Sequence, residues 1–229
     1  DVGYAGKRYT INDGSTNIWA QQFAASYGRT LDAASAGGVG YARGNARMTL
    51  TPDAAGVAGT RTVTQQIDDF LAAGTIGTND MVLVNSGISD IITQMAAVKA
   101  GTITEATLVA NAQTAGRELG AQVRRLVNAG GRYVVVVGPY DLARSPWAIK
   151  AGTTAQANAA SSAFNTALLV SIVDLGTNVL YIDAAYYFNL LVNSPGSYGL
   201  SNSTDVICTS VDSGNGIGIG TGQVNSALC

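Results

Sequence analysis

The stretch Tyr133-Val-Val-Val-Val137, followed directly by Gly138-Pro139, is the part of the sequence that most clearly predicts the fold. Its four valines are β-branched and favour a strand, while a Gly-Pro pair ends regular structure. The run is continuously apolar and does not alternate with polar residues, which is typical of a strand buried on both faces of a parallel sheet. We therefore expect residues 132–137 to form an interior strand.

Short apolar runs alternate with longer amphipathic stretches on both sides of this strand. We expect two further strands, at 80–85 and 178–183, and helices at about 18–28, 62–73, 104–129, 154–175 and 184–192. Strands that alternate with helices predict a mostly parallel sheet covered by helices. The sequence thus predicts one α/β domain over residues 1–229, a three-layer α/β/α arrangement of the flavodoxin-like kind.

The composition excludes several classes of protein. Of the 229 residues, 47% are hydrophobic and only 12% are charged, which is not the composition of a disordered chain. The formal net charge of −2 gives no basic surface for nucleic acid, so no nucleic-acid partner is expected. The longest apolar runs are shorter than the ~20 residues of a membrane-spanning helix, so no transmembrane segment is expected.

The sequence contains no histidine at all. These residues alone therefore cannot supply a histidine base, a Ser-His pair or a histidine-ligated metal. Only oxygen ligands for Ca²⁺ or Mg²⁺ would remain, and we expect no cofactor.

Two cysteines, Cys208 and Cys229, flank a stretch rich in glycine, serine and asparagine. A disulfide between them would close a loop of about 20 residues and stabilise the fold by about 3 kcal/mol. The alternative is two unrelated thiols. A disulfide implies an oxidising compartment, and the low charge and 28 glycines are typical of secreted bacterial proteins. We expect an extracellular or periplasmic bacterial protein.

Ligand sites of such folds lie beyond the carboxyl ends of the strands, where this chain has the segments 85–90 and 138–141 and the residue Asp183. Asp90, Asp141 and Asp183 all lie at these ends, which leaves open a pair of carboxylates for glycoside chemistry. The glycine-rich stretch 37–47 predicts a sharp loop that presents N–H groups to a reacting oxygen, or simply a structural turn.

Several segments together resemble the SGNH/GDSL hydrolase family, especially its secreted bacterial esterase and phospholipase-like branch. Asp1-Val2-Gly3 is similar to the end of the family's nucleophile motif, and the stretch 37–47 resembles its second block. Residues 80–90, a strand leading to Gly87-Ile-Ser-Asp90, match the third block. Tyr198-Gly-Leu-Ser-Asn-Ser-Thr-Asp205 resembles the family's Tyr-Gly-Phe-x-Asn-x-Thr-Asp segment.

This resemblance implies hydrolysis of a small-molecule or lipid carboxylic ester. It assigns an oxyanion-hole N–H to Gly44 and places Ser89 where the family has an asparagine that donates to the same oxygen. The family's Gly-Asp-Ser-Leu serine and its Asp-x-x-His block are not in this sequence, so the domain lacks the first strand and the C-terminal catalytic segment of the family.

Three interpretations remain at this point. The chain is part of an active esterase whose nucleophile and base lie outside these residues, or a catalytically inactive relative that binds or assembles outside the cell. The third is a different enzyme, such as a glycosidase with an acid pair. A sheet without its first strand exposes an edge that pairs with other chains, so self-assembly through this edge is also predicted.

Overall fold

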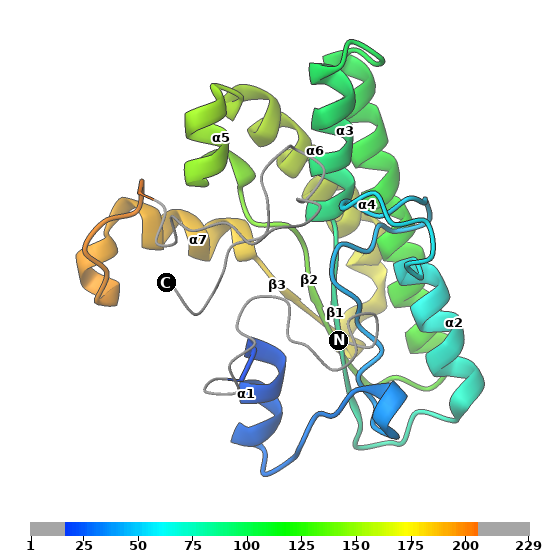
Figure 1. Ribbon diagram of the computed structural model, residues 1–229. Coiled ribbons are helices and arrows are strands. Elements are labelled where there is room, and N and C mark those ends of the chain that lie inside the picture. Colours follow the sequence, from blue (N-terminus) through cyan, green and yellow to red (C-terminus); the bar gives the residue numbers. More distant parts are fainter. Residues whose placement is uncertain (1–16, 206–229) are drawn as a thin grey trace. The chain divides into compact units, whose positions relative to one another are not determined.

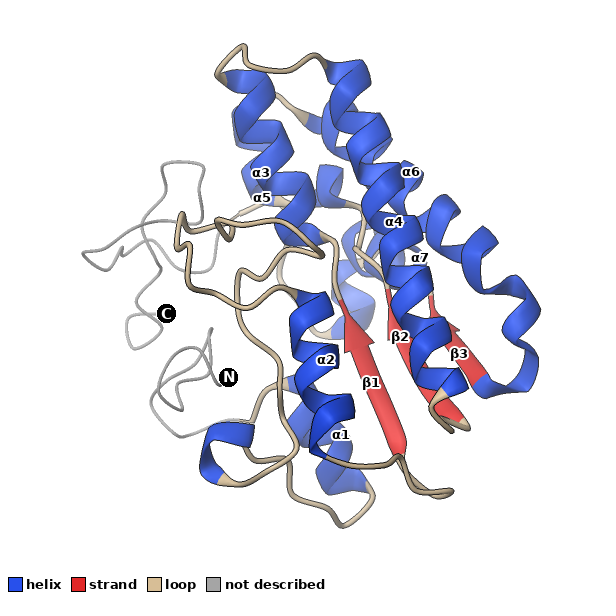
Figure 2. Cartoon of the chain, turned by 90° about the vertical axis from the view of Figure 1, so that its right-hand side faces the viewer, coloured by secondary structure: helices blue, strands red, loops and turns tan. Residues whose placement is uncertain are grey.

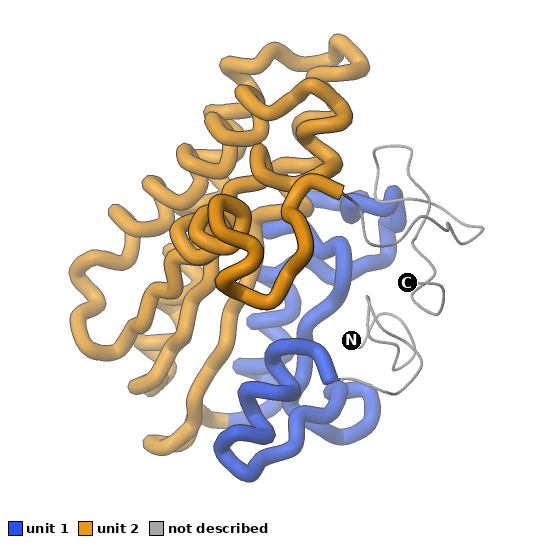
Figure 3. Tube along the Cα trace, turned by 90° about the vertical axis from the view of Figure 1, so that its left-hand side faces the viewer, with its two compact units in different colours: residues 1–74, 207–229 blue, residues 75–206 orange. Residues whose placement is uncertain are grey.

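The computed structural model describes residues 17–205, and the chain divides into two compact units (Figures 1 and 3). The described part of the first unit is 17–74, and that of the second is 75–205. Each unit is described by itself below. The prediction of one domain over residues 1–229 stays a prediction.

The second unit contains the sheet and most of the helices. Its elements in chain order are β1 (Met81–Asn85), α3 (Ile88–Lys99), α4 (Glu105–Asn128), β2 (Tyr133–Val137), α5 (Pro146–Ala151), α6 (Thr154–Ile172), β3 (Val179–Ile182) and α7 (Ala184–Asn193). Short 3-10 turns follow β2, α6 and α7, at Leu142–Arg144, Val173–Asn178 and Pro195–Tyr198.

The three strands of the described chain form a parallel sheet in the order β1-β2-β3, and all three point the same way in Figure 2. Val136 of β2 lies opposite Val84 of β1 and Tyr181 of β3. The central strand β2 is buried as its sequence predicts, with Val134 and Val136 fully inaccessible to solvent. The edge strand β3 is not, since Leu180 is 58% exposed.

Helices α4 and α6 pack against each other along most of their length. Small residues allow this close approach: a Cβ added at Gly116 would collide with the carbonyl oxygen of Phe164, and one added at Gly120 with the side chain of Ser171. Glycine in a helix interior is destabilising by roughly 1 kcal/mol relative to alanine, so the packing explains why glycine occurs here. Leu119 and Phe164 are completely buried in the resulting core.

The first unit carries α1 (Trp19–Ser26), a 3-10 turn at Ala34–Ala36 and α2 (Val63–Ala73). A capping box fixes the start of α2, because the Gln65 N–H donates to the Thr62 hydroxyl at 3.3 Å and the Thr62 N–H donates to Gln65 Oε1 at 3.0 Å. Val63 and Ile67 bury the apolar side of this helix.

The structure confirms the mixed α/β class and the three predicted parallel strands. The helices predicted at 18–28, 62–73, 104–129, 154–175 and 184–192 are also found, within a few residues at their ends. Two helices were not predicted, α3 and the short α5. Helix α3 follows β1 after a two-residue turn and therefore begins at the edge of the sheet where the candidate site residues lie.

Candidate functional site

The carboxyl ends of the three strands lie at one edge of the sheet because the strands are parallel. Ser86 follows β1, Gly138 follows β2 and Asp183 follows β3. Loops at this edge of parallel sheets form ligand sites in α/β proteins. The predicted segments 85–90 and 138–141 and the residue Asp183 therefore all follow strand ends at one edge of the sheet.

The turn after β1 is tied to the end of β2. The Ser86 N–H donates to the Val137 carbonyl at 3.4 Å, and the Asn85 side-chain amide donates to the same oxygen at 3.1 Å. The Ser86 hydroxyl is buried and has no hydrogen-bond partner within the described residues. Sequence reasoning included Ser86 in the candidate segment 85–90 but gave it no role of its own.

Gly87 makes the turn from β1 into α3 possible. Its φ of +117° lies in the region that side chains with a Cβ avoid. A Cβ at this position would also lie 2.9 Å from both Phe164 of α6 and Pro139 after β2. Gly87 thus allows the chain to turn sharply while packed against two neighbouring elements.

This turn places Ser89 in the first turn of α3, where its side chain is half-buried. The Thr93 hydroxyl donates to the Ser89 carbonyl at 2.7 Å. Asp90, the next residue, is buried. The N-terminus of a helix carries a partial positive charge, so α3 favours negative charge near Ser89.

Gly44, the second residue predicted to stabilise an oxyanion, lies in a turn of the first unit and is half-buried. The turn is completed by Asn45 in the left-handed conformation, with φ of +62°, a region that asparagine tolerates better than most residues. The Ala54 N–H donates to the Asn45 carbonyl at 3.0 Å, and the Val63 N–H at the start of α2 donates to the Arg47 carbonyl at 2.9 Å.

A buried carboxylate organises the loop that supports this turn. Asp53 accepts hydrogen bonds from the N–H groups of Ala55 and Val57, at 2.9 and 2.8 Å, and from the Thr60 hydroxyl at 2.7 Å. Residues 53–60 are therefore folded around one side chain. Gly44 belongs to the first unit and Ser89 to the second, and their joint role in one oxyanion hole stays a prediction.

A polar cavity of about 220 Å³ lies in the second unit, between the ends of β2 and β3 and the helices α6 and α7. Its lining includes two carboxylates and three asparagine amides, from Asp141, Asp183, Asn158, Asn165 and Asn189, together with hydroxyl groups such as that of Ser161. The structure therefore brings together two of the three aspartates predicted at strand ends. The third, Asp90, is not among the residues that line this cavity.

Asp141 is held by several groups. Its carboxylate accepts hydrogen bonds from the Ala143 N–H at 3.1 Å and from the Asn158 amide at 3.3 Å, and Arg144 Nε lies 3.9 Å from it. The same Nε donates to Asn189 Oδ1 at 3.1 Å. One arginine thus links a carboxylate after β2 to an amide on α7, which fixes one wall of the cavity.

Asp183 caps α7 and lies close to Tyr181. Its carboxylate accepts a hydrogen bond from the Tyr186 N–H at 2.9 Å. Burial of the Tyr181 ring, with a smaller contribution from the negative charge of Asp183, raises the pKa of Tyr181 to about 12. The cavity therefore carries a neutral phenol beside a carboxylate at physiological pH.

The polar residues of α6 were missed by sequence reasoning. Asn158, Ser161 and Asn165 are spaced by three and four residues along a helix that is otherwise rich in alanine and leucine. This spacing places them on one face of the helix, and Asn165 anchors that face by donating to the Pro139 carbonyl at 2.8 Å. A polar stripe on a core helix was the signal that could have identified this wall of the cavity.

Three further predictions concern metals, the disulfide and the membrane. Within residues 17–205, no group of three or more histidine, cysteine, aspartate or glutamate residues is placed to hold a metal ion. The predicted Cys208–Cys229 disulfide lies outside the described residues. Among the described residues, one stretch, Thr154–Asn178, is long and apolar enough to cross a membrane by length and composition alone, a test that core helices of soluble proteins also pass.

Comparisons with known proteins add no further evidence about this site. No protein-family model matches the chain, and no curated protein matches it.

Proposed function

We propose that the protein is a carboxylic ester hydrolase of the SGNH/GDSL type with a three-layer α/β/α fold. The observation that carries the proposal is the strand-turn-helix from β1 to α3, which presents Ser89 at the carboxyl edge of a parallel sheet. The resemblance of residues 80–90 to the third block of the family agrees with this placement. The tight turn at Gly87 supports it further, because it fixes where the helix starts.

In the proposed chemistry, this chain supplies the donors to the oxyanion, and groups outside it supply the nucleophile and the base. In ester hydrolysis by a serine, a base removes the hydroxyl proton while the carbonyl oxygen gains negative charge. The Gly44 N–H and the Ser89 hydroxyl are the proposed donors to that oxygen, and the N-terminus of α3 favours the same charge. Since these 229 residues contain neither a histidine nor the family's Gly-Asp-Ser-Leu motif, the nucleophilic serine and its base would come from outside them.

Substitution of Ser89 in the natural protein tests the proposal. The intact mass of the natural protein is first compared with the 23.3 kDa of these residues, and the activity of the natural protein is measured on a short-chain aryl ester. We expect Ser89→Ala to lower kcat by about 10²-fold with little change in KM, as loss of one oxyanion donor does. Ser89→Asn, which supplies a longer donor, should retain or increase kcat.

Thr114→Ala is the matched control, because Thr114 is an exposed residue of α4 whose hydroxyl bonds only within its own helix. This variant should keep full activity. The proposal is wrong if Ser89→Ala and Thr114→Ala have the same kcat. Ester hydrolysis by the 229 residues alone would also contradict it, because they contain no histidine base.

The substrate and compartment follow from the resemblance. We propose a small-molecule or lipid ester as substrate, and a secreted or periplasmic location in which Cys208 and Cys229 form a disulfide.

The second candidate function is a catalytically inactive binding or assembly protein. It is favoured by the outer edge of β1, to which no strand of the described chain is paired. The same ester assay separates the two candidates, because an assembly protein would show no turnover and no labelling by a fluorophosphonate.

A further inference from the structure

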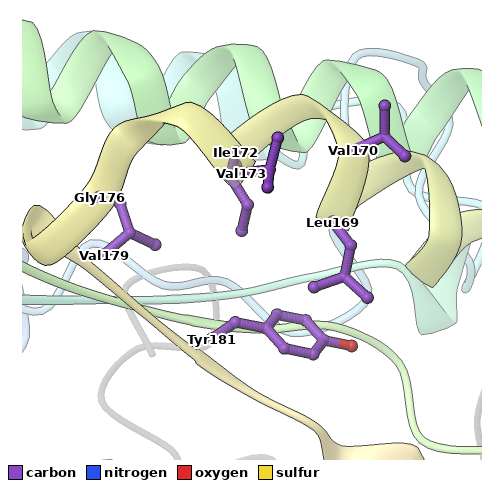
Figure 4. Close-up of a pocket in the computed structure, with 7 residues that line it drawn as sticks. All are labelled: Leu169, Val170, Ile172, Val173, Gly176, Val179 and Tyr181. Carbon is purple, nitrogen blue, oxygen red and sulfur yellow. The ribbon is translucent and has the colours of Figure 1, made fainter.

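The second unit carries an apolar groove beside the polar cavity. The groove has a volume of about 410 Å³ and lies between the C-terminal half of α6, the turn after it and β3 (Figure 4). Val170 and Val173 line it and are 71% and 79% exposed, which is unusual for apolar side chains at the end of a core helix. The face of α6 that meets α4 is buried, so these valines belong to the opposite side of the helix.

The groove and the polar cavity share a wall. Leu169 and Tyr181 line both, and in Figure 4 the Leu169 side chain points toward the Tyr181 ring. The two spaces are therefore neighbours on one surface of the unit. Together they fall within the ~300–1,000 Å³ typical of sites for small molecules.

The polar cavity favours a head group that donates hydrogen bonds and carries no negative charge. Its lining includes the carboxylates of Asp141 and Asp183, and Arg144 near Asp141 compensates one of the two charges. Hydroxyl groups can donate to these carboxylates and accept from the amides of Asn158 and Asn189. An anionic head would be repelled by the remaining carboxylate, whereas a neutral polyol complements the cavity.

From this juxtaposition, we propose that the groove and the cavity form one binding site for a single-chain amphiphile with a neutral polyhydroxyl head. The alkyl chain lies along the groove between α6 and β3, and the head occupies the polar cavity. The site does not depend on the proposed ester hydrolysis, because it uses neither Gly44 nor Ser89.

Nuclear magnetic resonance titration of the ¹⁵N-labelled chain with octyl glucoside, below its micelle-forming concentration, tests the proposal. We expect the backbone amide signals of Val170 and Val173 and the side-chain amide signals of Asn158 and Asn189 to shift with one common dissociation constant. Methyl glucoside, which lacks the chain, and octyl sulfate, which has an anionic head, should each bind at least about tenfold more weakly. Octyltrimethylammonium, whose head cannot donate hydrogen bonds to the carboxylates, should also bind more weakly than the glucoside.

Substitutions test each half of the site. Val173→Asn should weaken octyl glucoside binding by about tenfold, while Ile149→Asn, on an exposed position of α5 that does not line the groove, should leave it unchanged. Asp183→Asn keeps a side chain able to cap α7 but removes one charge, so it should raise the affinity for octyl sulfate several-fold.

Three results would overturn the proposal. The first is that signals of the groove and of the cavity saturate at different concentrations. The second is that octyl sulfate or the ammonium amphiphile binds as tightly as the glucoside. The third is that Val173→Asn and Ile149→Asn behave alike while both variants keep the spectrum of a folded chain.

Discussion

At the scale of single residues, the turn after β1 depends on a position where the backbone conformation and the available space both require glycine. Gly87 combines a φ of +117° with close neighbours on Phe164 and Pro139. Tyr181 is a second residue whose environment is unusual, since it is partly buried beside a carboxylate. Each leads to a measurable consequence.

Gly87→Ala is expected to reduce the free energy of unfolding by about 2 kcal/mol or more, because the new methyl group meets strain and steric overlap together. Denaturant unfolding measures the change. Gly196→Ala is the control, as a Cβ at Gly196 meets no atom within 4 Å. Equal unfolding free energies for the two variants would refute the role given to Gly87.

Tyr181 is expected to ionise at a pH of about 12, well above the usual tyrosine value of about 10. Since the folded state binds this proton more tightly than the unfolded state, the resulting stability is complete below pH 10 and is lost as the pH rises toward 12. Phenolate absorbance, taken as the difference between the wild-type chain and Tyr181→Phe, isolates the group. In Asp183→Asn the pKa of Tyr181 should fall but stay above 10, because burial is the larger cause. An unchanged pKa would show that the charge of Asp183 does not act on Tyr181.

At the scale of elements, the close packing of α4 on α6 is the central contact of the second unit. Gly116 and Gly120 lie one helical turn apart on the face of α4 that meets α6. Neither could carry a methyl group without moving the neighbouring helix. The position of α6, and with it one wall of both cavities, therefore depends on two glycines in the middle of a long helix.

Gly120→Ala is expected to lower the thermal midpoint even though alanine has the higher helix propensity, because the methyl group would overlap Ser171 and push the helices apart. Circular dichroism during heating gives the midpoint. Thr114→Ala on the exposed side of α4 should leave it unchanged or raise it slightly. A stabilised Gly120→Ala variant would contradict the packing argument.

The helices and strands that could be predicted from the sequence are those whose apolar residues form a regular pattern or whose ends are marked by glycine or proline. The valines of β2 and the three- and four-residue spacing in α4 predicted their elements directly. Helix α3 was missed even though Ile88, Ile91, Ile92 and Met95 recur at helical spacing, because its N-cap Gly87 offers no side-chain capping bond that would mark its start. The strand ends at Asp141 and Asp183 indicated one side of the polar cavity, whereas the asparagines of α6 lie far along the chain and meet them only through tertiary packing.

At the scale of the whole molecule, the described sheet has two edges without a paired strand. β1 is apolar except for its last residue, Asn85, and neither β1 nor β3 contains a proline or a charged residue that would discourage pairing. Self-association through the edge of β1 is therefore the expected behaviour of the 229-residue chain.

Light scattering at increasing protein concentration should show a rising average mass for the chain. Met81→Lys, at an exposed position of β1, should shift the chain toward the monomer, because a charged side chain discourages edge pairing. Met81→Leu preserves the apolar edge and should associate as before. A monomeric wild-type chain at all concentrations would rule out this mode of assembly.

The loop around Asp53 has a consequence for how this protein could be modified. The shape of the loop is fixed by one buried carboxylate, which accepts hydrogen bonds from two N–H groups and a hydroxyl. The outward side chains, such as the exposed Val57, contribute little to that shape. Reporter groups or binding epitopes could therefore be grafted onto the outer positions of this loop, provided that Asp53 and Thr60 are kept.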